Sequence, residues 1–154
     1  MEIILEFLIA MVATISFSIL FNAPRRELPF CGLTGALGWL VYRILVINGL
    51  SAPIASMFAT AVLTIFTRLL AVWRQMPGTV YLLAGIFPLV PGAGLYYTAY
   101  YLFIGEKSLS GQYASDTLLI AGAIVFGIIF GFAIPQKFFH TICKKRAFFN
   151  KKQA

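Results

Sequence analysis

Apolar residues dominate this chain in five long runs that short polar segments separate. The runs cover residues 3–21, 30–48, 51–72, 79–104 and 117–135. Each is close to, or longer than, the roughly 20 residues that a helix needs to cross about 30 Å of hydrocarbon. The segments between them contain Pro, Gly, Asn and Ser, which are typical of turns. The pattern therefore predicts an all-α fold, a polytopic membrane bundle of five transmembrane helices.

Composition agrees with lipid as the main solvent of these runs. Of the 154 residues, 60% are hydrophobic and 11% are charged, whereas soluble domains carry about 25% charged residues. A water-soluble domain of about 150 residues buries roughly 70% of its unfolded surface, which leaves too much apolar surface uncovered here. We expect residues 1–136 to form the transmembrane domain and residues 137–154 to form a basic cytoplasmic tail.

Lysine and arginine are distributed unevenly between the two sides of the predicted bundle. With the N-terminus outside, only Arg43 and Lys107 face outward, and ten basic residues face the cytoplasm. These ten are Arg25, Arg26, Arg68, Arg74, Lys137, Lys144, Lys145, Arg146, Lys151 and Lys152. The positive-inside rule therefore predicts an outside N-terminus and a cytoplasmic C-terminus. Because the net charge of +7 is spread over clusters between and after apolar runs, it does not indicate a nucleic-acid partner.

The fourth run contains prolines and glycines at its centre. Pro88 and Pro91 lack an amide proton, so the carbonyl four residues before each of them loses its usual helical partner. Gly92 and Gly94 loosen the backbone just beyond. Since residues 79–104 are centred near position 91, the sequence predicts a fourth helix broken at Pro88/Pro91, near the bilayer midplane.

Two interpretations of this break stay open. Irregular backbone at membrane depth is tolerated inside protein or beside a wet cavity. A helix that restarts after Pro91 also points its positive dipole end at the membrane centre, where a substrate carboxylate could bind. Tyr96 and Tyr97 follow closely enough to line such a cavity. The alternative is a proline-kinked structural helix without a ligand, because Pro and Gly are common in membrane spans.

The third run carries a polar face that also has two interpretations. Thr60, Thr64 and Arg68 recur at four-residue spacing, so they share one side of a helix. They form either a polar wall of the substrate pathway, with Arg68 attracting a carboxylate, or an ordinary packing face with a snorkelling arginine. Arg43, near the outer end of its helix, is either a snorkelling arginine or a second anion-attracting group. Glu6 is either a shallow, exposed glutamate or a proton-coupling carboxylate.

Catalytic and metal-binding patterns are missing from the sequence. No nucleophile stands near a base, and no phosphate-binding glycine loop is present. His140, the only histidine, has no cysteine or carboxylate cluster around it at metal-ligand spacing. Cys31 and Cys143 both lie toward the cytoplasmic side and are expected to be reduced. We therefore expect neither an enzyme nor a cofactor or metal.

The segment from Arg74 through Pro77 to the run FPLVPGAGLYY resembles the central signature of the threonine/serine exporter family, in its short five-span half. The matching positions are Arg74, Pro77, Pro88, Leu89, Val90, Pro91 and Gly92. The resemblance implies a secondary transporter subunit in the bacterial cytoplasmic (inner) membrane. Its implied substrates are small hydrophilic metabolites, either threonine- and serine-type amino acids or a dicarboxylate such as succinate.

A larger five-span partner subunit of the same family, with a hydrophilic N-terminal region, is also implied. Five spans with an outside N-terminus complement five spans of opposite orientation, so the two would form an inverted repeat around a midplane site. The alternative function is a non-transporting membrane scaffold or regulatory subunit of a larger membrane protein. The residues leave homo-oligomerisation open.

Overall fold

A computed structural model describes residues 2–135, and every regular element in that part of the chain is a helix. The elements are α1 (Glu2–Leu20), α2 (Leu28–Ile47), α3 (Ala52–Arg74), α4 (Gly78–Ile86), the 3-10 helix η1 (Phe87–Leu89), α5 (Gly92–Phe103) and α6 (Lys107–Ala133). The tail expected at residues 137–154, with His140 and Cys143, lies outside the described residues.

Turn chemistry sets the helix ends. Proline stands in the first turn of α2 and of α3, where its missing N–H costs no helical hydrogen bond. Gln75 ends α3 in the left-handed conformation with φ 55°, and its N–H donates to the Ala71 carbonyl. Gly49 and Gly105 take φ 87° in the turns after α2 and α5, a conformation that favours glycine.

Small residues hold the core helices together. The α carbon of Gly35 packs on the side chain of Thr14, so α1 and α2 approach closely, and Gly38 packs on Leu63 of α3. In lipid such close contact replaces the hydrophobic drive between helices. Beside these contacts lies a cluster of buried apolar side chains from α3, α4, η1 and α6. It consists of Ala59, Leu63, Leu82, Leu89 and Ile124.

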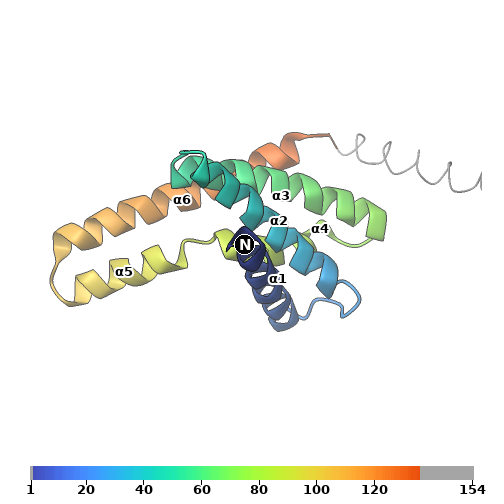
Figure 1. The fold of residues 1–154 in the computed structure, drawn as a ribbon, viewed down its shortest axis with the longest axis horizontal. Coiled ribbons are helices and arrows are strands. Elements are labelled where there is room, and N and C mark those ends of the chain that lie inside the picture. The colour runs from blue at the N-terminus through green and yellow to red at the C-terminus, as the bar shows by residue number, and fades with distance from the viewer. Residues whose placement is uncertain (1, 136–154) are drawn as a thin grey trace, which may run out of the picture.

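The chain divides into two regions in Figure 1. We call α1 to α4, η1 and residues 119–133 of α6 the core, because these elements pack on several neighbours each. We call α5 with residues 107–118 of α6 the arm. These two antiparallel segments, yellow and light orange in Figure 1, lie side by side and project away from the other helices.

The polar segment before the last apolar run is helical from Lys107 onward, which corrects our expectation of a turn between the fourth and fifth runs. It contains no proline, and α6 begins already at Lys107, ten residues before the start that hydropathy predicts. The hydroxyl of Ser110 donates to the Thr98 carbonyl of α5, 2.8 Å away, and Thr117 packs on Gly94. Contacts with α5 therefore stabilise helix where polarity suggested a loop.

An all-helical membrane fold is confirmed. Within the described residues α1, α2, α3 and α6 are each long and apolar enough to cross a membrane. Gly78–Leu89 and Gly92–Phe103 meet these criteria together and are bent by 51° at the break between them. The five-span count, with this pair as one broken span, stays a prediction, as do the orientation and the domain limits.

Candidate functional site

The chain segment between α4 and α5 forms two bends instead of a continuous helix. Pro88 lies in η1 and Pro91 directly precedes α5 with φ −76°, while Val90 between them is extended. We expected the carbonyls of Ala84 and Phe87 to lack partners. Each carbonyl instead accepts a hydrogen bond from the N–H of the residue three positions later in the chain, as in a 3-10 turn. The irregular backbone is therefore largely satisfied from within.

The break lies close to the level of the middle of α3. Gly85 of α4 packs on Leu63, the middle residue of the 23-residue α3. Pro88 and Pro91 follow three and six residues later, which corresponds to about 5 and 9 Å along a helix. Leu89 is buried in the cluster with Leu63. The core thus fixes the start of the break, and the arm begins at its far side.

Residues that follow the break point in different directions. Gly94 packs on Thr117 of α6, and the ring of Tyr97 lies 5.3 Å from that of Tyr113. Tyr96 is 63% exposed. At Gly92 an added Cβ would meet nothing within 4 Å. Of the candidate tyrosines, Tyr97 therefore lies against α6, and Tyr96 lies on an open face of α5.

The threonines of α3 pack against the glycines of α6. The hydroxyls of Thr60 and Thr64 donate to carbonyls one turn earlier in α3, at 2.6 and 2.8 Å, and both side chains are fully buried. Gly127 packs on Thr60 and Gly131 on Thr64. This is the packing arrangement that the sequence left as one alternative, and any contact of these threonines with substrate stays a prediction.

Arg68 reaches the end of α6. Its Nη1 lies 2.9 Å from the Gly131 carbonyl oxygen and 2.6 Å from that of Ile134. A guanidinium at a helix C-terminus binds carbonyls that have no helical partner and complements the negative dipole end. The nine candidate residues therefore fall into two groups, one around the break and one along the α3–α6 contact. Both groups meet α6, at Thr117 and at residues 127–134.

A buried charge cluster, which we call the Glu27 cluster (Glu27, Arg74 and Tyr81), joins three helices at one end of the core. Arg74 donates to both carboxylate oxygens of Glu27, from Nε at 3.1 Å and from Nη2 at 2.7 Å. The Tyr81 hydroxyl donates to Glu27 at 2.6 Å. Glu27 is 5% exposed, and Tyr81 is fully buried. The cluster fastens the start of α2 to the end of α3 and to α4.

Sequence reasoning missed the role of Glu27. The hydrogen bonds with Arg74 hold the pKa of Glu27 below its ordinary value, although burial acts in the opposite direction and Tyr81 again lowers it. The one available signal was a lone carboxylate directly after Arg25 and Arg26 in a basic turn. Its partners lie 47 and 54 positions away, so the sequence could not pair them.

The other end of α2 carries a weaker counterpart. Nε of Arg43 lies 3.0 Å from the Glu6 carboxylate without hydrogen-bond geometry, and the indole N–H of Trp39 donates to Glu6 at 3.3 Å. Both charged side chains are partly exposed. The structure therefore pairs two groups that the sequence led us to interpret separately. Each end of α2 is joined to a neighbouring helix by an arginine–glutamate pair.

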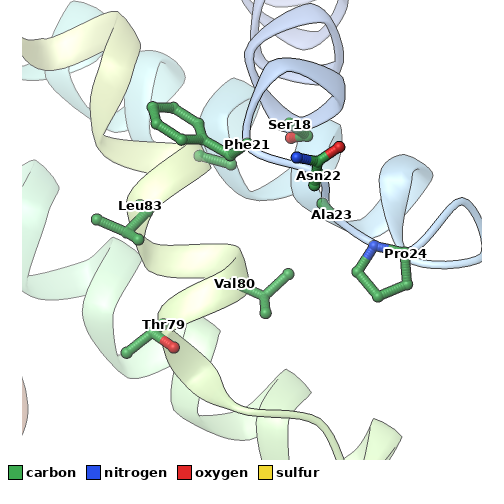
Figure 2. A pocket seen from close by; sticks show the side chains of 9 residues that line it. Ser18, Phe21, Asn22, Ala23, Pro24, Thr79, Val80 and Leu83 are labelled. Atoms are coloured by element: carbon green, nitrogen blue, oxygen red, sulfur yellow. The ribbon is translucent and has the colours of Figure 1, made fainter.

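A small pocket of about 140 Å³ lies between the end of α1 and α4. Figure 2 shows the end of α1 and the following turn on one side of it and α4 on the other. Its lining consists of Ser18, Phe21, Asn22, Ala23, Pro24, Thr79, Val80, Leu83 and Ala84. No charged side chain lines it, and Pro88 and Pro91 are not part of it. In the described residues no group of three or more His, Cys, Asp or Glu side chains is placed to hold a metal.

Comparison with known proteins gives a family and several curated relatives. A family model described as "Threonine/Serine exporter, ThrE" matches residues 6–134. A Haemophilus influenzae protein with the printed name "Uncharacterized protein" is 26% identical over 148 residues, which are 91% of this chain and 48% of the relative. The chain thus spans about half the length of that relative. No solved structure matches the chain.

The family match includes α2, α3, α4, η1, α5 and α6 and most of α1. This one region of similarity therefore contains the break, the Glu27 cluster and every candidate site residue. Several apolar helices and a transporter family both point to a role in membrane transport. On this evidence, the chain belongs to the threonine/serine exporter family.

Proposed function

We propose that this chain is one half of a secondary transporter that exports small hydrophilic metabolites bearing a carboxylate. Threonine- and serine-type amino acids, or a dicarboxylate such as succinate, are the proposed substrates. The other half is a larger five-span partner of the same family, and the pair works in a bacterial cytoplasmic membrane with this chain's N-terminus outside. The half length relative to the Haemophilus influenzae protein supports a division into two parts.

The observation that carries the proposal is the break between α4 and α5. Its prolines begin about 5 Å beyond the level of Leu63, so the irregular backbone lies deep in a bilayer that α3 crosses. α5 begins after Pro91, at Gly92, where an added Cβ would meet nothing within 4 Å. A helix N-terminus of this kind attracts a carboxylate. Interrupted helices are a common substrate site of secondary transporters.

Gly92 offers a direct test, because the described residues leave room for a side chain there. In Gly92→Leu the Cβ would enter open space, and the rest of the bulky side chain would extend into the proposed site. We expect uptake of radiolabelled threonine, serine or succinate into inverted vesicles that contain both halves to fall about tenfold or more. The matched control is Gly122→Leu, at an α6 glycine that is also open. Equal flux in both variants, with both halves assembled, would sink the proposal.

A specific observation favours the second candidate function, a non-transporting scaffold or regulatory subunit. The hydroxyls of Thr60 and Thr64 donate within α3, and Arg68 donates to carbonyls at the end of α6. The same Gly92→Leu experiment separates the two functions. A scaffold predicts unchanged flux with Gly92→Leu, and lost assembly with variants of the α3–α6 contact.

A further inference from the structure

α5 has an outer face that no described residue covers. None of its residues is buried, and the partly buried ones, Gly94, Thr98 and Tyr101, are spaced so that they form the side that meets α6. We call Tyr96, Tyr100 and Phe103, on the opposite side, the aromatic ridge. These three side chains are 63%, 46% and 88% exposed. The rings of Tyr96 and Tyr100 stack at 6.1 Å, and Phe103 lies on the same side of α5 one turn beyond Tyr100.

The aromatic ridge lies beyond the hydrocarbon of a bilayer that α3 crosses. Gly127 of α6 is level with Thr60 of α3, and Gly131 is level with Thr64, so the two helices keep the same register over this contact. The same register places the start of α3 beside residue 119 of α6. Residues 107–118 therefore extend about 18 Å past α3. α3 itself is about 34 Å long, which already exceeds the roughly 30 Å of lipid tails. Figure 1 shows the same projection of α5 and the first half of α6.

Lipid tails are thus poorly placed to cover the ridge, and water would leave a largely exposed Phe103 unfavourably solvated. Exposed tyrosines and phenylalanines at a projecting site are typical of protein interfaces. The Haemophilus influenzae relative has as much chain again outside its region of similarity. In that protein, a further stretch of about the same length therefore belongs to the same chain as the region similar to this one.

We infer that the aromatic ridge docks the complementary half of the transporter, an apolar helical surface with hydrogen-bond acceptors for the hydroxyls of Tyr96 and Tyr100. This inference rests on the proposed function for the existence of that half. It adds the place of contact: the two halves meet outside the lipid tails, on α5. Docking there would also enclose the open side of Gly92 and Tyr96, which this chain leaves uncovered.

Site-specific photocrosslinking in membranes of the native host tests the inference. Benzoylphenylalanine replaces Tyr100 or Phe103, and in the control it replaces Ile9 or Val12, which are each 60% exposed on α1. We expect ridge crosslinks to a polypeptide whose peptides match the part of the longer relatives beyond this chain's region of similarity. Crosslinks to lipid only, to a second copy of this chain, or equally from α1 would overturn the inference.

A second measurement keeps docking separate from folding and from transport. In Tyr100→Ser with Phe103→Ser we expect at least a tenfold drop in the other half that copurifies, with an unchanged thermal midpoint of this chain, whereas Ile9→Ser should copurify normally. Normal copurification of the ridge variant would contradict docking there. Docking without any flux of the tested substrates would instead contradict the proposed function and leave the docking surface standing.

Discussion

The core and the arm use the same kind of helix contact with different results. Gly131 meets Thr64 in the core and Gly94 meets Thr117 in the arm. Yet α3 has eight buried residues and α5 has none. In the arm α5 packs chiefly on α6, which buries Ser110 and Thr117 of α6 but leaves the other side of α5 exposed. A contact between two helices therefore sets how closely they pack, whereas the number of neighbouring helices sets how much of each helix is buried.

Disrupting the Glu27 cluster, which lies in the core, should lower the stability of the chain more than any substitution in the arm. Glu27→Ala removes the partner of both Arg74 and Tyr81 and leaves a cation facing buried surface, so we expect the thermal midpoint to fall by about 10 °C. Unfolding is followed by the fluorescence of Trp39 and Trp73. Glu2→Ala, at an exposed glutamate of α1, is the matched control. Equal midpoints for the two variants would show that the cluster does not hold the core.

Glycines of α6 allow the packing argument to be tested within one helix. An added Cβ at Gly127 would meet Thr60 and the Met57 carbonyl, whereas at Gly122 it would meet nothing within 4 Å. Gly127→Ala should destabilise the chain by about 1–3 kcal/mol. Gly122→Ala should be neutral or stabilising by up to about 1 kcal/mol, because alanine favours helix. Thermal unfolding in one detergent compares them, and equal effects would contradict the close approach of α3 and α6.

Low pH should lower the stability of the core, because it protonates Glu27. Its pKa is lowered in the folded chain, so its contribution is fully present above the unfolded pKa of about 4.3 and is lost as the pH falls through the lower folded value. We expect the difference in thermal midpoint between wild type and Glu27→Gln to be constant above about pH 5 and to shrink below about pH 4. A difference that grows in acid would reverse the sign that we assign.

Substitutions in the arm should change the global free energy of unfolding least. Gly94→Ala places a Cβ against Thr117, while Gly92→Ala meets open space. We expect both to change the free energy of unfolding of the core by less than about 0.5 kcal/mol, and Gly94→Ala alone to speed hydrogen exchange of the α5 amides. If Gly94→Ala lowers the stability of the core as much as Gly127→Ala does, the two regions form one cooperative unit.

The helices of the core could be predicted because their apolar runs are long and bounded by turn residues. The start of α6 could not, since Ser110 and Thr117 are stabilised by contacts with α5 that hydropathy does not register. The two bends around Pro88 and Pro91 follow from the missing amide protons, but the compensating hydrogen bonds depend on the folded backbone.

The candidate site was less accessible from sequence. The spacing of Thr60 and Thr64 correctly predicted a shared face, but nothing in it says that Gly127 and Gly131 cover that face. The same limit applies to Glu27, because residues that pair across distant helices leave no local signal. Sequence periodicity identifies faces of helices, and only the fold decides which faces meet.

α6 runs from the α3 contact to the tip of the arm as one uninterrupted helix of 27 residues. Mechanically it is a lever whose held part, residues 119–133, packs along α3 and is bound at its end by Arg68. The free part, residues 107–118, is about 18 Å long. A rotation of about 10° where α6 leaves α3 would therefore move the tip by about 3 Å. A force applied to the arm would thus reach the threonine face of α3 without crossing a flexible joint.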